Sequence, residues 1–117
     1  GDRDATKREP LAEIAAQLAD VLWVTDENPR TEDASSIRQQ LLNGIRRVRP
    51  DLHDVTEVTT CRRDAVRQAI LAANEGDIVV ISGKGAEWYQ DIQGIKHVYN
   101  DVPVAREVLE QDIRARL

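Results

Sequence analysis

The sequence is poor in cysteine and in aromatic residues. Cys61 is the only cysteine among 117 residues, which excludes an internal disulfide and any metal site built from several cysteines. A single cysteine also fits a reducing compartment. The chain has no phenylalanine and only two tryptophans and two tyrosines, so its core has to be built from valine, isoleucine, leucine and alanine.

Long apolar runs and an excess of positive charge are missing as well. No apolar run approaches the ~20 residues that a membrane-spanning helix needs, and no signal-peptide pattern opens the chain. The net charge is −5 and no block of lysine and arginine stands out, which argues against binding to the phosphate backbone of nucleic acids. We therefore expect a cytoplasmic protein that binds neither nucleic acid nor a membrane.

The residues that are present describe an ordinary globular domain. A hydrophobic content of 41% with 32% charged residues is typical of folded chains. The length of 117 residues predicts one domain, residues 1–117, large enough for a core but small for a whole metabolic enzyme.

Helical and strand-like segments alternate along the chain. Apolar residues at helical spacing predict helices at residues 10–20, 33–49 and 63–74 and a last helix from Pro103. Short apolar runs predict buried parallel strands at residues 21–25 and 77–83, the second being the clearest strand in the sequence. Residues 55–58 predict a less buried strand near the sheet edge, and residues 95–99 a small hairpin after a loop.

This alternation predicts an α/β domain of three layers, with a mainly parallel sheet between helices. Three strands make a thin sheet for such an architecture. We therefore expect the leading strands of the domain to be absent from this chain.

Three polar loops, at residues 1–8, 25–30 and 82–87, lie at one edge of the predicted sheet. In open α/β sheets, ligands bind outside the carboxyl ends of the strands. Asn28 offers donors and an acceptor, Pro29 stiffens the turn, and Arg30 has a planar fork that suits a carboxylate or a phosphate. Taken alone, each loop also reads as a solvated turn, with Lys84 as an exposed charge, and residues 83–85 lack the spacing of a Walker loop.

Taken in order, the three loops resemble the C-terminal domain of the Mur ligases. They read Gly-Asp-Arg-Asp-x-x-Lys-Arg from Gly1, Thr-Asp-x-Asn-Pro-Arg from Thr25, and Gly-Lys-Gly-x-Glu-x-Tyr-Gln from Gly83. The resemblance runs to about Leu109, and within the family it is greatest to the ligases that add 2,6-diaminopimelate in peptidoglycan synthesis.

The resemblance implies a Rossmann-like domain that belongs to a three-domain, ATP-dependent amide ligase. ATP, with Mg²⁺, would activate the D-glutamate side chain of a UDP-linked muramoyl dipeptide as an acyl phosphate. The amino group of meso-diaminopimelate would then attack it. This domain would bind the incoming amino acid and help close over ATP. Nucleotide and metal would be held mainly in other domains of the same ligase, so the chain alone is not expected to be active and no catalytic residue is assigned to it.

The family motif, transferred position by position, predicts the amino-acid site. The far end of meso-diaminopimelate carries a carboxylate and an ammonium; arginines suit the first and a glutamate suits the second. Family members that add lysine replace the arginine of the Asn-Pro-Arg loop, so this arginine indicates diaminopimelate. The predicted substrate-binding residues are Arg3, Glu27, Asn28, Pro29, Arg30, Gly83 and Glu87.

Two positions depart from the family pattern. Glu27 stands where aspartate is usual, which makes the loop carboxylate one methylene longer, and Ala86 stands where histidine is usual. Neither His53 nor His97 is expected to replace that histidine. Two other readings stay open: a glutamate ligase of the Mur or folylpolyglutamate type, and a non-catalytic Rossmann-like binding module.

Overall fold

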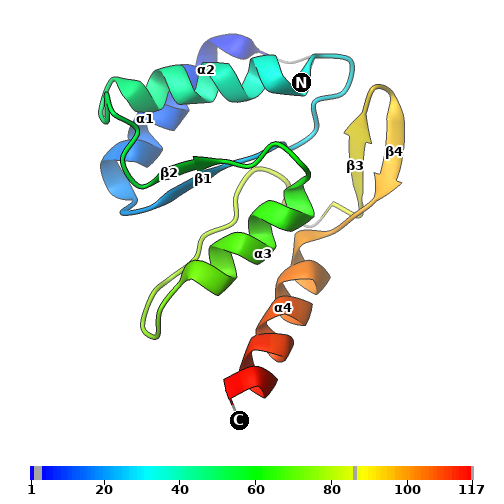
Figure 1. The fold of residues 1–117 in the computed structure, drawn as a ribbon. Coiled ribbons are helices and arrows are strands. Elements are labelled where there is room, and N and C mark those ends of the chain that lie inside the picture. The colour runs from blue at the N-terminus through cyan, green and yellow to red at the C-terminus, as the bar shows by residue number, and fades with distance from the viewer. Residues whose placement is uncertain (2–3, 86, 117) are drawn as a thin grey trace.

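The computed structural model describes residue 1, residues 4–85 and residues 87–116 (Figure 1). A 3-10 turn, η1 (Ala5–Lys7), leads into the first of four α-helices, α1 (Arg8–Leu18), α2 (Ala34–Arg46), α3 (Arg62–Ala72) and α4 (Asp101–Arg116). The described strands are β1 (Leu22–Val24), β2 (Val55–Glu57), β3 (Tyr89–Ile92) and β4 (Ile95–Val98). No described helix has both the length and the apolar character needed to span a bilayer.

A parallel pair of strands forms the middle layer. β1 and β2 run side by side with Leu22 opposite Val55 and Val24 opposite Glu57. Helices α1 and α2 pack on one side of the pair and α3 lies on the other (Figure 1). The expected α/β arrangement with helices on both faces is therefore confirmed.

Two clusters that are aliphatic except for Tyr99 hold the elements together, as the shortage of aromatic residues predicts. The first joins α1, α2 and β1 through Ala12, Ala16, Val24, Leu42 and Ile45. At the crossing of α1 and α2, a Cβ atom added to Gly44 would lie 2.3 Å from the carbonyl oxygen of Glu9, so the glycine permits the close approach of the two helices. The second cluster joins α3 to α4 and contains Val66, Ile70, Tyr99, Val104 and Val108.

The predicted strand at residues 77–83 is wrong. The segment has no ladder partner among the described strands, so the parallel sheet has two strands rather than three. Ile81 packs against the cluster of α3 and α4, whereas Ile78 and Val80 are 89% and 81% exposed. An apolar run of this kind becomes a strand only when neighbouring strands accept and donate its backbone hydrogen bonds. No described strand pairs with residues 77–83 in this way.

A hairpin is present but spans more residues than predicted, because residues 95–98 form only its second strand and residues 89–92, predicted as loop, form the first. β3 and β4 pair antiparallel, with Ile92 opposite Ile95. Gln93 and Gly94 between them both have positive φ angles, 54° and 78°, as a tight two-residue turn requires. Helix α4 begins at Asp101 rather than at Pro103, which leaves the proline in the first turn, where its missing N–H is not needed.

Candidate functional site

The loop at residues 25–30 is held in place by the β3–β4 hairpin. The side-chain amide of Gln90 donates to the carbonyl oxygen of Glu27 at 2.8 Å and to that of Asp26 at 3.4 Å. The backbone N–H of Arg30 donates to the carbonyl oxygen of Asp91 at 2.9 Å. Two segments that are about 60 residues apart in the sequence therefore form one unit.

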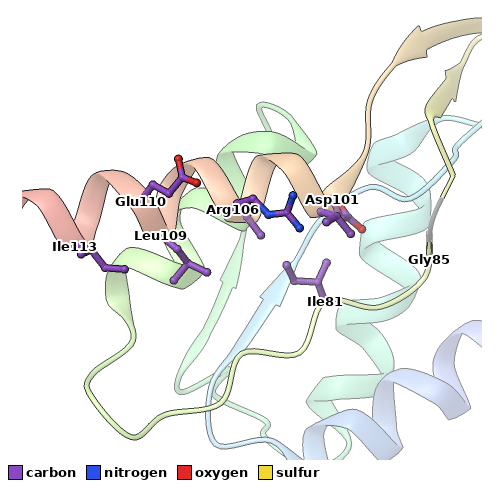
Figure 2. A pocket seen from close by; sticks show the side chains of 9 residues that line it. Ile81, Gly85, Asp101, Arg106, Leu109, Glu110 and Ile113 are labelled. Atoms are coloured by element: carbon purple, nitrogen blue, oxygen red, sulfur yellow. The ribbon is translucent and has the colours of Figure 1, made fainter.

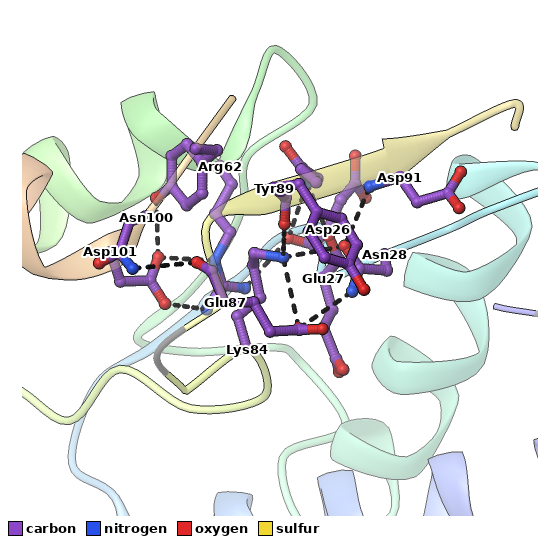
Figure 3. Close-up of polar contacts among 12 residues, drawn as sticks. Asp26, Glu27, Asn28, Arg62, Lys84, Glu87, Tyr89, Asp91, Asn100 and Asp101 are labelled. Atoms are coloured by element: carbon purple, nitrogen blue, oxygen red, sulfur yellow. Dashed lines mark hydrogen bonds and ion pairs between the residues drawn. The ribbon is translucent and has the colours of Figure 1, made fainter. Parts of the chain in front are cut away.

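Asn28 is the centre of this unit and is 2% exposed (Figure 3). Its Oδ1 accepts from Lys84 Nζ at 2.9 Å and from the backbone N–H of Asp91 at 3.1 Å. Its Nδ2 donates to Glu87 Oε1 at 3.2 Å. Because two donors meet one end of the amide and a carboxylate meets the other, the network fixes which end is oxygen.

Lys84 is buried, contrary to its reading as an exposed turn residue. Its side chain is 0% exposed, and Nζ donates to Asn28 Oδ1 and, at 2.5 Å, to the carbonyl oxygen of Tyr89. Nζ also lies 3.6 Å from Glu87 Oε1, while the Glu87 side chain is 34% exposed. The sequence offers no local signal for this burial, since Lys84 lies between two glycines in a polar turn.

The remaining site residues lie around this core. Arg30, at a φ of 54°, donates from Nη1 to the carbonyl oxygen of Gly1 at 3.1 Å and to that of Asn28 at 3.5 Å. Gly83 has a φ of 108°, and a Cβ atom added to it would lie 2.9 Å from Glu27 Oε2. Only a glycine suits this backbone angle without strain.

The structure brings most of the predicted site residues together. Asn28 contacts Glu87 through its side chain and Arg30 through its backbone, Glu27 lies against Gly83, and Pro29 is buried. Arg3, like Ala86, lies outside the described residues.

A buried ion pair behind the site was not predicted from the sequence. Arg62 Nε and Nη2 donate to the two carboxylate oxygens of Asp101, each at 2.9 Å. Arg62 also donates to the carbonyl oxygens of Asp26 and Ser82, both at 3.0 Å. These two residues directly precede Glu27 and Gly83, so one guanidinium fixes the start of both motif loops.

The pKa values of Asp101 and of its neighbour Tyr99 are shifted in this buried cluster. Burial opposes the charged form of Asp101, but the hydrogen bonds from Arg62 and from the Tyr99 hydroxyl outweigh it, so the pKa of Asp101 lies below its ordinary value of 3.8. Burial, followed by the hydrogen bond to Asp101, raises the pKa of Tyr99. Asp101 is therefore a carboxylate and Tyr99 a neutral phenol at neutral pH.

An open cavity of about 420 Å³ lies between residues 81–85 and helix α4 (Figure 2). It is lined mostly by apolar side chains, and none of Asn28, Arg30 and Glu87 borders it. A binding site for a small polar molecule needs several convergent polar groups. The polar cluster around Asn28, rather than this cavity, is therefore the candidate site.

The Mg²⁺ ion that the resemblance implies does not fit a site in the described part of the chain. No group of three or more histidine, cysteine, aspartate or glutamate residues is placed there to hold a metal ion. His53 is exposed and bonds Asp51 at 2.7 Å, and His97 is exposed on β4.

The fold and the two motif loops define a class of protein, and comparison with known families gives that class its name. The model of the family described as Mur ligase, glutamate ligase domain, matches residues 1–85. The chain therefore belongs to the Mur ligase family.

Within that family, the chain is similar to ligases that carry one name. The chain is 45% identical over 109 residues to the UDP-N-acetylmuramoyl-L-alanyl-D-glutamate–2,6-diaminopimelate ligase of Xylella fastidiosa (strain Temecula1) and 42% identical over 111 residues to that of Corynebacterium efficiens. Each match covers 93% of this chain and 21% of the relative. A solved structure of a ligase of the same name superposes with a TM-score of 0.80 at 35% identity, over 96% of this chain and 22% of the other. The chain thus spans about a fifth of the length of the relatives that it matches.

Proposed function

We propose that this chain is the amino-acid-binding domain of an ATP-dependent ligase that adds meso-diaminopimelate to UDP-linked muramoyl-L-alanyl-D-glutamate in peptidoglycan synthesis. The observation that carries the proposal is the convergence of the Asn28 amide, the Glu87 carboxylate and the Arg30 guanidinium on one loop cluster. The similarity to diaminopimelate ligases over nearly the whole chain supports it.

The cluster offers complementary groups for one zwitterionic end of the amino acid. Glu87 uses Oε1 for Asn28 and Lys84, and no described residue donates to its Oε2, which suits a substrate ammonium. Arg30 donates from Nη1, and no described residue accepts from its Nη2, which suits a substrate carboxylate. Such charge-assisted hydrogen bonds are about twice as strong as neutral ones.

Holding the far end of the amino acid would place its other amino group for reaction. That amine would attack the acyl phosphate carbon, a C–N bond would form, and the C–O bond to phosphate would break, releasing inorganic phosphate. The contribution of this chain would be orientation of the nucleophile. We place ATP and Mg²⁺ in the remainder of the ligase, with this domain helping to close over the nucleotide.

The test is an Arg30→Ala variant of the full-length ligase. A hydrogen bond to a charged group contributes about 1.5–3 kcal/mol, so the KM for meso-diaminopimelate should rise about 10- to 150-fold. The KM values for ATP and for the UDP-linked dipeptide should not change. L-lysine, which lacks the far carboxylate, should be a poor substrate of the unmodified enzyme and should be little affected by the substitution.

Arg47→Ala is the matched control, because Arg47 is a 53% exposed arginine that pairs with Glu9 and Glu13 on α1. Its kinetics should equal those of the unmodified enzyme. Equal use of lysine and diaminopimelate by the unmodified enzyme would show that Arg30 does not select the substrate.

A further inference from the structure

Lys84 is a buried cation for which the amino-acid site assigns no role. Its ammonium group has three N–H donors. Two are used by Asn28 Oδ1 and the carbonyl oxygen of Tyr89, and the carboxylate of Glu87 lies 3.6 Å away (Figure 3). A buried ammonium is costly unless it is paired and hydrogen-bonded. The two polar side chains near this ammonium, those of Asn28 and Glu87, belong to the proposed binding site.

The ammonium determines the orientation of the Asn28 amide. A side-chain amide can rotate by 180° and exchange its oxygen and its NH₂ group. Rotation here would turn the NH₂ group toward two donors, Lys84 Nζ and the N–H of Asp91. Without Lys84, one of the two donors to Oδ1 is lost, and only the N–H of Asp91 and the Glu87 carboxylate would still oppose the rotation, so Asn28 would be held less firmly as a donor to Glu87.

The same contacts select one oxygen of Glu87 for the interior. Oε1 accepts from Asn28 Nδ2 and faces the ammonium of Lys84, so the carboxylate is anchored through that atom. No described residue donates to Oε2. We propose that Lys84 is a positioning residue that, through Asn28 and its own charge, presents Glu87 Oε2 to the ammonium group of the incoming amino acid. This inference rests on the proposed function of the site.

The experiment is a double-mutant cycle in the full-length ligase with Lys84→Met and Glu87→Gln. Each single variant should raise the KM for meso-diaminopimelate about tenfold or more, with kcat and the KM for ATP changed less than about twofold. Because Lys84 acts through Glu87, adding Lys84→Met to the Glu87→Gln enzyme should raise the KM by less than about twofold. A purely structural lysine would instead give additive effects.

Lys96→Met is the matched control. The Lys96 ammonium also lies over the Tyr89 ring, at 4.7 Å from its centroid, compared with 5.7 Å for Lys84. Lys96, however, is exposed on β4. Its removal should leave every kinetic constant unchanged. If Lys96→Met raised the KM as Lys84→Met does, the effect would belong to the Tyr89 ring and the inference would be overturned.

The outcomes separate this inference from the function on which it rests. If Glu87→Gln leaves the KM for diaminopimelate unchanged, the proposed binding site is wrong. If Glu87→Gln raises it but Lys84→Met does not, or the two effects add, only the positioning role fails. If Lys84→Met does not fold, Asn28→Asp tests the same step, because it keeps the oxygen that Lys84 contacts and replaces the donor to Glu87 by a second oxygen. An unchanged KM in that variant would overturn the inference.

Discussion

Arg62→Met should be the most destabilising single substitution behind the candidate site. It removes a guanidinium whose side chain is 4% exposed from a carboxylate that is 8% exposed. The Tyr99 hydroxyl, at 2.7 Å, would remain as a hydrogen-bond partner of Asp101. The carbonyl oxygens of Asp26 and Ser82 would each lose a donor.

The expected loss of unfolding free energy is about 3–5 kcal/mol, the usual cost of removing one partner of a buried ion pair. Asp26 is half-buried and Ser82 is exposed, so water can replace the lost donor at their carbonyl oxygens, and we expect no further loss of unfolding free energy there. Whole domains have unfolding free energies of only about 5–15 kcal/mol. Adding Asp101→Asn to Arg62→Met should recover about 1–3 kcal/mol, because the buried negative charge is then removed as well.

Urea unfolding of the 117-residue chain, followed by circular dichroism, measures these differences. Arg67→Met is the matched control on the same helix, because Arg67 bonds Gln111 on an exposed surface and should contribute less than about 0.5 kcal/mol. A loss below about 1 kcal/mol for Arg62→Met, or no recovery in the double variant, would refute the reasoning.

The pH dependence gives a second readout of the same pair. Since the pKa of Asp101 is lowered in the folded state, its contribution to stability is complete above the unfolded pKa of about 3.9 and is lost as the pH falls through the lower folded value. The unmodified chain and Arg62→Met should therefore differ most at neutral pH and converge below about pH 4. Convergence near pH 7 instead would mean that Asp101 is not the group involved.

Two further substitutions test packing and the unpaired apolar segment. Gly44→Ala should lower the unfolding free energy by about 1–3 kcal/mol, because its Cβ atom would lie 2.3 Å from the carbonyl oxygen of Glu9 and push α1 away from α2. An unchanged midpoint of urea unfolding would contradict this. The isolated chain should self-associate as its concentration rises, because Ile78 and Val80 are exposed on a segment without a strand partner among the described residues. Size-exclusion chromatography with light scattering measures this, and Val80→Lys should reduce the association. A strictly monomeric unmodified chain would contradict the prediction.

The parts of the fold that depend on local pattern were predictable. The helices follow from apolar spacing, and β1 lies where a short apolar run follows a helix. β2 lies where Val55 and Val58, with polar residues between them, predict a less buried strand. Residues 77–83 have the clearest strand pattern of all and still do not form a strand. The pattern shows that residues 77–83 are apolar on both faces. A strand also needs a neighbouring strand to pair with, and the local sequence does not show whether one is present.

The candidate site divides in the same way. The loop residues Asn28, Arg30 and Glu87 follow from a motif resemblance, and the structure places them together. Of the residues that hold them, Lys84 reads as an ordinary charge in a turn, and the sequence does not single out Arg62, at the start of α3. Their burial comes from partners 56 and 39 positions away in the sequence, Asn28 and Asp101, which only the tertiary fold reveals.

The departure at Glu27 has a structural explanation in its contact with Gly83. The carboxylate of Glu27 lies over a position where a Cβ atom would approach Oε2 to 2.9 Å, and the φ of 108° independently requires a glycine there. An aspartate in this loop would hold its carboxylate one methylene further back. The longer side chain therefore extends over the bare backbone of the turn that carries Lys84 and Glu87. Since Gly83 leaves this space, the two motif loops can accommodate a glutamate without displacing the Asn28 side chain, which contacts Lys84, Glu87 and Asp91.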